Sequence, residues 1–285
     1  ILYISFYYSP GLSGVSQTMV IQSGMTNRVI AQDFKKNDLI SSPALFLAFT
    51  FLSDQSRLIA GNYQFRSGET ISQIVSRIAQ GRSYQVKVTF PEGSTVKQMA
   101  EWLDQAGICR QEDYLSYTQQ PTIFQKPWLS DAKNLEGYLF PDTYYLSPGT
   151  NPKQVIEIQL KRFEEVYPGS LLEESFTEMS QKVILASIVE REAQLINEKP
   201  IVASVFLNRL KSNMKLESCA TVIYAWNQEK GVQLSSLSLE DLTIPSPYNT
   251  YLHKGLPPTP ICNPSLDSLE AVVNPPQTDY YFFVL

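Results

Sequence analysis

One long apolar stretch dominates the pattern of hydrophobic and polar positions along the chain. Residues 181–194, QKVILASIVEREAQ, contain an almost unbroken apolar run that ends in Glu-Arg-Glu. No helix-breaking residue interrupts the run, and apolar side chains cover most of the helix circumference, which is typical of a buried helix. On the 3.6-residue period Glu190 shares a face with the small residues Ala186 and Ser187, whereas Glu192 lies roughly 200° away. The pattern therefore predicts a buried helix whose last turn presents Glu190 where another molecule can approach it.

The first part of the chain repeats a shorter pattern three times. In each repeat an extended segment is followed by Gly-x-Thr and then by apolar residues at helical spacing. Each threonine is a natural N-cap, so each motif marks a turn that opens a short helix. The extended segments are residues 16–21, 60–65 and 84–90, and the capping residues are Thr26, Thr70 and Thr95. With two further helices at 42–52 and 111–117, the repeats predict a small α+β module over residues 16–120.

Longer helices and aromatic turns are predicted for residues 121–285. Besides the buried helix, helices are expected at 152–167, 199–211 and 266–273. Residues 279–285, DYYFFVL, predict a strand; an exposed terminal strand of this hydrophobicity is unusual, so we expect the native domain to continue beyond it. The expected fold class is α+β: a small strand-turn-helix module, then a mixed α/β domain built around the helix that carries Glu190.

Composition and charge exclude several classes of function. The chain has 285 residues, of which 43% are hydrophobic and 18% charged, and this indicates a globular protein with room for two domains. The net charge is −5 and no large basic block occurs, which argues against a nucleic-acid partner. Cys109, Cys219 and Cys262 lie far apart, and His253 is the single histidine. This pattern disfavours a zinc site and a Ser-His or Cys-His nucleophile, so no metal or organic cofactor is expected.

The chain starts with an apolar and aromatic segment. ILYISFYY precedes Pro10-Gly11, and this run is too short to span a bilayer. It is compatible with a first strand, or with the outer stump of a transmembrane anchor that has Tyr7 and Tyr8 at the membrane interface. We expect residues 1–15 to be such a stump or a linker.

The carboxyl group of Glu190 is the main candidate for chemistry. In a buried setting desolvation disfavours the anion, so we expect a raised pKa. A carboxylic acid that is neutral at pH 7 can protonate a leaving group. The alternative is a buried helix that simply ends in a solvated Glu-Arg-Glu turn, since charged helix ends are common.

Several motifs occur in an order that resembles one known family. They are LEGYLFPDTY (135–144), ILASIVERE (184–192), ASVFLNRL (203–210), SPYNTY (246–251), GLPPTPICNP (255–264) and DYYFFV (279–284). With them the chain resembles the YceG-like, or MltG, family of endolytic murein transglycosylases over most of its length. The resemblance implies a LysM-like module at residues 16–120 and a catalytic domain at 121–285. It also implies a single-pass anchor in the inner (plasma) membrane, a catalytic domain on the periplasmic or extracytoplasmic side, peptidoglycan strands as substrate and wall-synthesis proteins as neighbours.

The resemblance further implies a reaction and a set of site residues. Enzymes of this family cut the β-1,4 bond between MurNAc and GlcNAc inside glycan strands and leave a 1,6-anhydroMurNAc end. The catalytic glutamate of the family falls on Glu190, as acid and then base; the nucleophile comes from the substrate, so the second carboxylate of ordinary glycosidases is not required. The candidate substrate-binding residues are Glu136, Tyr248, Asn249, Thr250, Glu217 and Thr221. For each of them a structural role in its own turn or on the surface stays open.

Two features depart from the family pattern. Cys219-Ala220 stands where the family usually has Asp-Pro, and a thiol does not replace a carboxylate as an acceptor. The family also continues beyond Val284 with a Gly-rich segment. Two alternatives therefore stay open: a catalytically silent peptidoglycan-binding protein, and a hydrolytic muramidase that uses Glu190 with Glu136 or Asp142.

Overall fold

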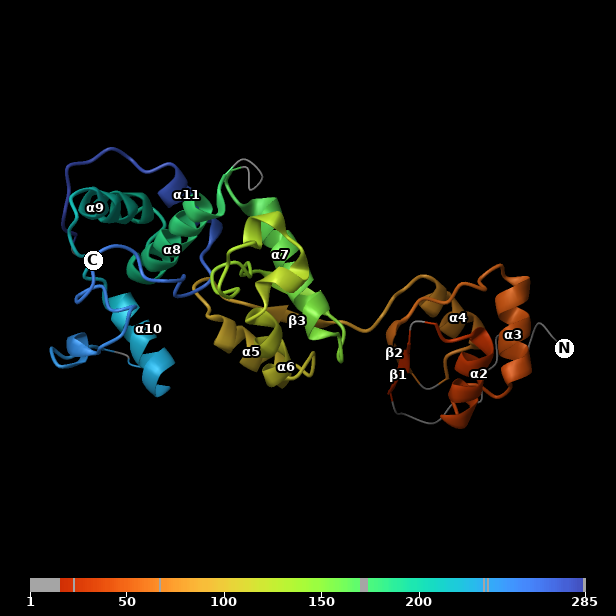
Figure 1. The fold of residues 1–285 in the computed structure, drawn as a ribbon. Helices are drawn as coiled ribbons and strands as arrows, with labels where there is room; N and C mark the ends of the chain where they lie inside the picture. The colour runs from red at the N-terminus through yellow and green to blue at the C-terminus, as the bar shows by residue number, and fades with distance from the viewer. Residues whose placement is uncertain are drawn as a thin grey trace. The chain divides into compact units, whose positions relative to one another are not determined.

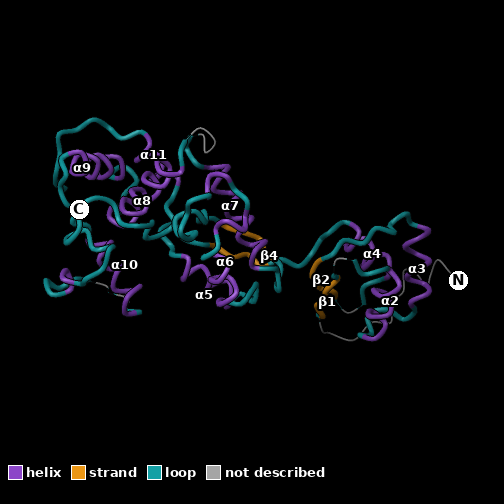
Figure 2. The backbone as a smooth tube through the Cα atoms, viewed as in Figure 1, coloured by secondary structure: helices purple, strands orange, loops and turns teal. Residues whose placement is uncertain are grey.

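The computed structural model describes residues 16–22, 24–66, 68–169, 174–232, 234 and 236–283 (Figure 1). The described residues form two compact units. Unit 1 runs to Lys87 and includes Tyr145–Gly149; unit 2 contains Val88–Tyr144 and the described residues from Thr150 onward. Helices predominate, with two small pairs of strands (Figure 2). The α+β class expected from the sequence is confirmed.

Unit 1 combines one antiparallel strand pair with three helices. Strand β1 (Gln17–Ile21) pairs with β2 (Gly61–Phe65) so that Gln17 lies opposite Phe65. The helices are α2 (Asn27–Lys36), α3 (Pro43–Leu52) and α4 (Ile71–Ala79). Their core is aromatic: the ring of Phe34 meets those of Phe46 and Phe65 edge-on, with centroids 5.7 and 5.3 Å apart.

The first part of unit 2 forms a mixed layer. Strand β3 (Val86–Thr89), along which the chain enters unit 2 at Val88, pairs with β4 (Thr143–Leu146), along which the chain leaves it after Tyr144. Helices α5 (Val96–Gln105), α6 (Gln111–Thr118) and α7 (Pro152–Val166) pack in sequence, α6 touching both of the others. Two 3₁₀ turns, η1 (Pro121–Phe124) and η2 (Pro127–Leu129), follow α6. They lead to the aromatic turn, residues 134–142, which precedes β4.

The second part of unit 2 is a helical cluster around α8 (Phe176–Glu192). It contains α9 (Lys199–Lys211), α10 (Cys219–Lys230), the 3₁₀ turn η3 (Asp241–Thr243) and α11 (Leu266–Val273). Helix α8 lies among α9, α10 and α11 and contacts all three (Figure 1). Every residue from Val183 to Val189 is buried. The prediction of a buried central helix is therefore confirmed.

Local sequence signals located most element ends correctly. Thr26, Thr70 and Thr95 each accept a hydrogen bond from a backbone N–H in the first turn of the following helix. The third repeat, however, packs in unit 2, because the backbone of Gly93 and Ser94 pairs with that of Asn263 at 3.0 and 2.9 Å. Contacts thus divide the chain at Lys87/Val88, whereas the sequence pattern placed the end of the first module near residue 120. The LysM-like character of that module stays a prediction.

The strand predicted at residues 279–285 is wrong over its described part, 279–283, which is irregular. Side chains of α9 take the carbonyl groups that a neighbouring strand would otherwise bind. Asn208 Nδ2 donates to the carbonyls of Thr278 and Tyr280 at 2.7 and 3.0 Å, and Arg209 Nε donates to that of Tyr281 at 2.7 Å.

Membrane attachment was predicted for residues 1–15, which lie outside the described residues. Within the described part, none of the helices has the length and apolar character needed to cross a bilayer.

Candidate functional site

The carboxylate of Glu190 lies in the last turn of α8, where four hydrogen-bond donors converge on it. Helix α8 starts with a capping box between Ser175 and Glu178, and it ends at Ala193, whose backbone turns to an extended conformation. Glu190 Oε2 accepts from Lys199 Nζ at 3.0 Å and from the backbone N–H of Ser265 at 3.0 Å. It also accepts from Ser265 Oγ at 2.5 Å and Ser268 Oγ at 2.6 Å. All four contacts go to the same oxygen.

The donors come from the ends of two neighbouring helices. Lys199 is the first residue of α9, and Ser265 is the N-cap of α11, accepting in turn from the backbone N–H of Ser268. The N-terminus of α11 therefore points toward the carboxylate, where the partial positive charge of a helix start favours an anion. Only 4% of the Lys199 side chain and 8% of the Glu190 side chain are exposed, so this ion pair is buried.

The pKa of Glu190 is lower than its ordinary 4.5, although burial acts to raise it. Hydrogen bonds from Ser265 and Ser268 and the positive charge of Lys199 outweigh the desolvation. The raised pKa that we expected from burial is therefore wrong for the free protein, because the sequence pattern showed the burial of Glu190 and not the donors around it. Since the folded-state pKa is lowered, the carboxylate stabilises the fold above pH about 4.5, and this contribution is lost as the pH falls through the lowered value.

Glu192 lies on a different face of α8 from Glu190, as the helical period predicted. It contacts the start of α10. Its Oε1 accepts from Ser218 Oγ at 2.5 Å and from the backbone N–H of Ala220 at 3.1 Å, at the start of α10. Cys219, the first residue of α10, is exposed, and its Sγ lies 3.3 Å from the hydroxyl of Tyr251. The α10 segment that departs from the family pattern therefore contacts Glu192 rather than Glu190.

Three of the candidate binding residues gather near Glu192. Thr221 Oγ1 lies 2.8 Å from Thr250 Oγ1, and Thr250 Oγ1 accepts from the backbone N–H of Ser218 at 3.0 Å. Both threonines are buried, whereas the Glu217 side chain is 47% exposed and lies 3.4 Å from Arg209 Nη1. The threonines thus hold the loop at 246–251 against α10, and Glu217 lies at the protein surface.

Asn249 and Tyr248 lie in the same loop but have different surroundings. Asn249 is fully buried, and its Nδ2 donates to the carbonyls of Leu242 and Ile244 at 2.8 and 3.0 Å. The Tyr248 ring packs edge-on against Tyr224, and its hydroxyl lies 2.7 Å from Thr259 Oγ1. Asn249 therefore fixes the loop, while Tyr248 lines a cavity.

Glu136 is a second buried carboxyl, held by one backbone N–H donor and one side-chain amide. Its Oε1 accepts from the backbone N–H of Val96 at 3.0 Å and from Asn263 Nδ2 at 3.1 Å. Burial raises its pKa to about 8, against the lowering effect of the Val96 hydrogen bond. Asn263 also accepts, through Oδ1, from the backbone N–H groups of Gly137 and Leu139 at 2.9 and 3.0 Å. Asn263 thus joins the aromatic turn to the start of α5.

Two adjacent cavities of unit 2 share Lys97 and Tyr224 in their walls. The first, of about 400 Å³, is lined by Arg191 and Ile261 among others. The second, of about 450 Å³, contains both Glu136 and Tyr248. Their volumes fall in the range of small-molecule sites. The structure therefore brings Glu136 and Tyr248 to one cavity, beside another that reaches Arg191, the neighbour of Glu190 in the chain.

We expect Glu136→Gln to make the fold less sensitive to alkaline pH. The pKa of Glu136 is raised to about 8, so the stability contributed by its neutral form is complete below pH about 4.5 and is lost as the pH rises toward 8. Glutamine keeps an acceptor for Val96 and has no charge to bury, so the variant should gain about 2–4 kcal/mol relative to wild type between pH 4 and pH 9. Urea unfolding across that range measures the gain, with the exposed Glu270→Gln as control. Parallel pH profiles for wild type and Glu136→Gln would contradict the prediction.

Sequence reasoning missed Lys199, Ser265, Ser268 and Asn263. One signal was available for Lys199: a lysine at a helix N-terminus opposes the helix dipole, so it needs a nearby anion. Glu92 was missed as well; burial and the neighbouring charge of Glu190 both raise its pKa. Among the described residues, no three His, Cys, Asp or Glu side chains come together as a metal site would require.

The fold and site define an α+β protein with a buried, serine- and lysine-bound carboxylate at the end of its central helix. The model of the YceG-like family matches residues 19–285, and the chain belongs to this family.

Relatives and a solved structure support the family. The chain is 32% identical over 282 residues to a Bacillus subtilis protein named endolytic murein transglycosylase, covering 93% of this chain and 77% of the relative. It is 26% identical over 296 residues to a Streptococcus pneumoniae protein of the same name and spans only 54% of that relative's length. The 2.6 Å crystal structure of a YceG-like protein from Listeria monocytogenes matches with a TM-score of 0.61 and 28% identity, covering 95% of this chain and 93% of that one.

Proposed function

We propose that this chain is an endolytic lytic transglycosylase that acts on murein. It cleaves the β-1,4 bond between MurNAc and GlcNAc within glycan strands and leaves a 1,6-anhydroMurNAc end. The family relationship and the names of the relatives support the murein transglycosylase activity. The residue that carries the chemistry in this proposal is Glu190.

The observation that carries the assignment is the asymmetry of the Glu190 carboxylate. All four donors bind Oε2, and no described residue donates to Oε1. One oxygen is therefore fixed by the fold while the other is available to a substrate. Such an arrangement orients a carboxyl group, which proton transfer in a transition state requires.

A single carboxyl group suffices for the proposed reaction. Protonated Glu190 donates its proton to the glycosidic oxygen as the bond to C1 of MurNAc breaks. The resulting carboxylate then takes the proton of the C6 hydroxyl, whose oxygen forms the new bond to C1. The low pKa in the free protein means that the proton must be taken up with substrate bound, when exclusion of water raises the pKa of the carboxyl.

We propose supporting roles for the other candidate residues. Glu136 and Tyr248 bind the glycan strand through their shared cavity, and Glu217 contacts it with its half-exposed carboxylate. Asn249, Thr250 and Thr221 act by holding the loop and α10 in place, because their polar groups already bind each other or nearby backbone. No metal, cofactor or nucleic acid takes part. The enzyme works on the extracytoplasmic side of the inner membrane, anchored by a segment at its N-terminus and beside the wall-synthesis proteins.

Digestion of isolated peptidoglycan with product analysis by mass spectrometry tests the proposal. The unmodified chain should release internal fragments that end in 1,6-anhydroMurNAc, and Glu190→Gln should release none. Glu192→Gln, which changes the other carboxylate of the same helix turn, should retain cleavage. Reducing ends in place of anhydro ends would establish hydrolysis, and loss of activity only in Glu192→Gln would move the catalytic role to that residue.

The four donors that keep Glu190 anionic also favour a second function, a catalytically silent protein that binds murein. That reading predicts binding of peptidoglycan without any cleavage by the unmodified chain. The same digestion, combined with sedimentation of the protein with peptidoglycan, separates the two functions.

A further inference from the structure

Glu92 carries a second carboxyl group beside Glu190 that the proposed reaction does not use. It belongs to the turn before Thr95, the N-cap of α5, and this turn lies against the last turn of α8. A Cβ atom on Gly93 would lie 3.4 Å from Cγ of Glu190 and 3.5 Å from Cδ of Arg191. The backbone adjacent to Glu92 therefore packs on the candidate catalytic residue.

The turn that carries Glu92 is fixed by the segment that also holds Glu190. The backbone N–H of Gly93 donates to the carbonyl of Asn263 at 3.0 Å, and the N–H of Asn263 donates to the carbonyl of Ser94 at 2.9 Å. Asn263 lies just before Ser265, whose hydroxyl and backbone N–H bind the carboxylate of Glu190. The relative position of the two carboxyl-bearing segments is therefore set by backbone hydrogen bonds within unit 2.

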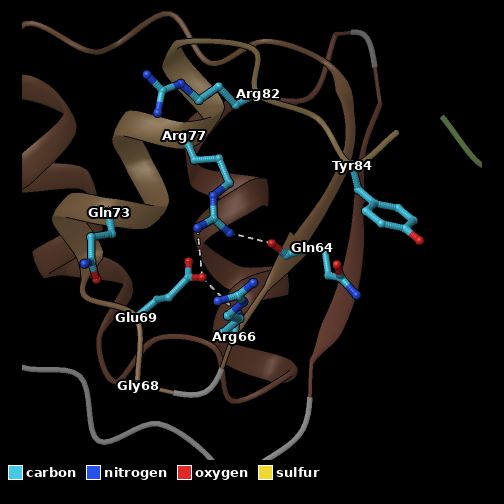
Figure 3. Close-up of a pocket in the computed structure, with 8 residues that line it drawn as sticks. All are labelled: Gln64, Arg66, Gly68, Glu69, Gln73, Arg77, Arg82 and Tyr84. Atoms are coloured by element: carbon cyan, nitrogen blue, oxygen red, sulfur yellow. Dashed lines mark hydrogen bonds and ion pairs between the residues drawn. The ribbon is translucent and has the colours of Figure 1, made fainter. Parts of the chain in front are cut away.

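The corresponding turn of unit 1 uses its carboxylate differently. There Glu69 follows the glycine of the repeat, and its Oε1 accepts from Arg77 Nη2 at 2.9 Å and from the backbone N–H of Arg66 at 3.0 Å (Figure 3). That charge is neutralised within the turn. Glu92 precedes the glycine instead; its side chain is exposed, and no described residue donates a hydrogen bond to it. The carboxylate of Glu92 is therefore not needed to hold its turn and is free to act on the neighbouring site.

Charged groups from three helices surround the two carboxyl groups. Partial burial and then the charges of Glu190 and of Asp267 on α11 raise the pKa of Glu92, whereas the charge of Lys199 on α9 lowers it. Arg191 of α8 adds a second cation beside the turn. The charges of Glu92 and Glu190 therefore repel each other in a site where the cations only partly offset them.

The proposed reaction needs a proton on Glu190, although its four donors favour the anion. A second negative charge nearby favours protonation of a carboxyl group, and it does so more strongly where bound substrate excludes water. Cys262 does not supply this charge, because burial raises the pKa of its thiol and keeps it neutral. Glu92 is exposed to solvent in the free protein, where its effect is screened, and a glycan lying over Glu190 would remove that screening.

We propose that Glu92 is a positioning residue of this active site, whose negative charge holds a proton on Glu190 until the glycosidic oxygen accepts it. This role rests on the proposed function. Glu190 takes one proton from water as the glycan binds and passes it to the leaving oxygen, and Glu92 stays ionised throughout. Glu92 neither attacks C1 nor activates water, so the product keeps its 1,6-anhydro end and the reaction stays distinct from that of two-carboxylate glycosidases.

The pH dependence of murein cleavage tests the proposal. Glu92→Gln keeps the size of the side chain and removes its charge, so the pKa of Glu190 in the complex should fall. The alkaline limb of the pH–rate profile should therefore move down by about one pH unit, with a rate about tenfold lower above the limb. Glu92→Asp, which keeps the charge, should retain most of the wild-type profile. Glu157→Gln, at an exposed carboxylate of α7, is the control and should leave the profile unchanged.

A second measurement does not depend on turnover. The side-chain carboxyl signals of ¹³C-labelled chain, followed by NMR against pH, report the pKa of Glu92, and the signal is assigned by its loss in Glu92→Gln. This pKa should be lower in Glu190→Gln than in wild type, because the charge of Glu190 is one of the causes that raise it. An unchanged pKa would mean that the two carboxyl groups do not interact, and the proposal would fall.

The cleavage assay distinguishes the remaining outcomes. An unshifted alkaline limb in Glu92→Gln, or an equal shift in Glu157→Gln, removes the role of Glu92 and leaves the proposed reaction in place. Complete loss of cleavage by Glu92→Gln at every pH, with an unchanged urea unfolding curve, also overturns the proposal, since Glu92 would then be the proton donor itself. If the unmodified chain leaves murein intact, the proposed reaction fails and the role of Glu92 fails with it.

Discussion

Replacing Gly137 with alanine should unfold unit 2 or destabilise it by about 4 kcal/mol or more. A Cβ atom at this position would lie 2.4 Å from Cγ and 2.5 Å from Cβ of Pro260, and 3.0 Å from Cγ1 of Val183. The backbone is also left-handed there, with φ of +91°, which an alanine adopts only with strain. Neither neighbour can move freely: Pro260 has a rigid ring, and Val183 belongs to the buried part of α8.

Gly107 provides the matched control. Its φ is +67°, and a Cβ there would meet nothing within 4 Å, so Gly107→Ala should cost only about 1–2 kcal/mol for the left-handed backbone. Urea unfolding followed by tryptophan fluorescence compares the two variants. Similar losses would show that the backbone conformation, and not the contact with Pro260, decides the cost at Gly137.

The elements of this fold were predictable where a local signal defines them. The threonine caps fix the starts of three helices, because each hydroxyl binds a backbone N–H only a few residues away. The buried helix was predictable as well, because its unbroken apolar run is also a local signal. The prediction of a strand at 279–285 was wrong over its described residues. The conformation of this segment depends on hydrogen bonds from side chains of α9, some seventy residues away in the chain.

The candidate site was predictable only in part, because it depends on contacts that are distant in sequence. Glu190 could be singled out from its own helix. Its four donors come from Lys199, Ser265 and Ser268, and no pattern within one segment brings these residues together. The error in the direction of the pKa shift follows directly: burial is visible in a sequence, whereas the donors that reverse its effect are not.

Replacing Lys199 with methionine should destabilise the fold by about 2–4 kcal/mol at pH 7, because it leaves a buried carboxylate without its cation. The pair is 3.0 Å apart, and both side chains are almost fully buried. Methionine fills a similar volume, so the loss of charge dominates the effect. Lys153→Met, which breaks the exposed pair with Glu157 at 3.8 Å, is the control and should cost less than about 1 kcal/mol.

The same substitution should raise the pKa of Glu190, and this gives the prediction a readout that simple loss of packing would not produce. Because Lys199 is one of the groups that lower this pKa, its removal favours the protonated carboxyl. The stability difference between Lys199→Met and wild type should therefore shrink as the pH falls through the lowered pKa of wild-type Glu190, since both proteins then hold a neutral carboxyl. If Glu190 acts as the general acid, the alkaline limb of the pH–rate profile for murein cleavage should move to higher pH in Lys199→Met. An unchanged limb together with a pH-independent loss of stability would mean that Lys199 only packs against α8 and does not control the protonation of Glu190.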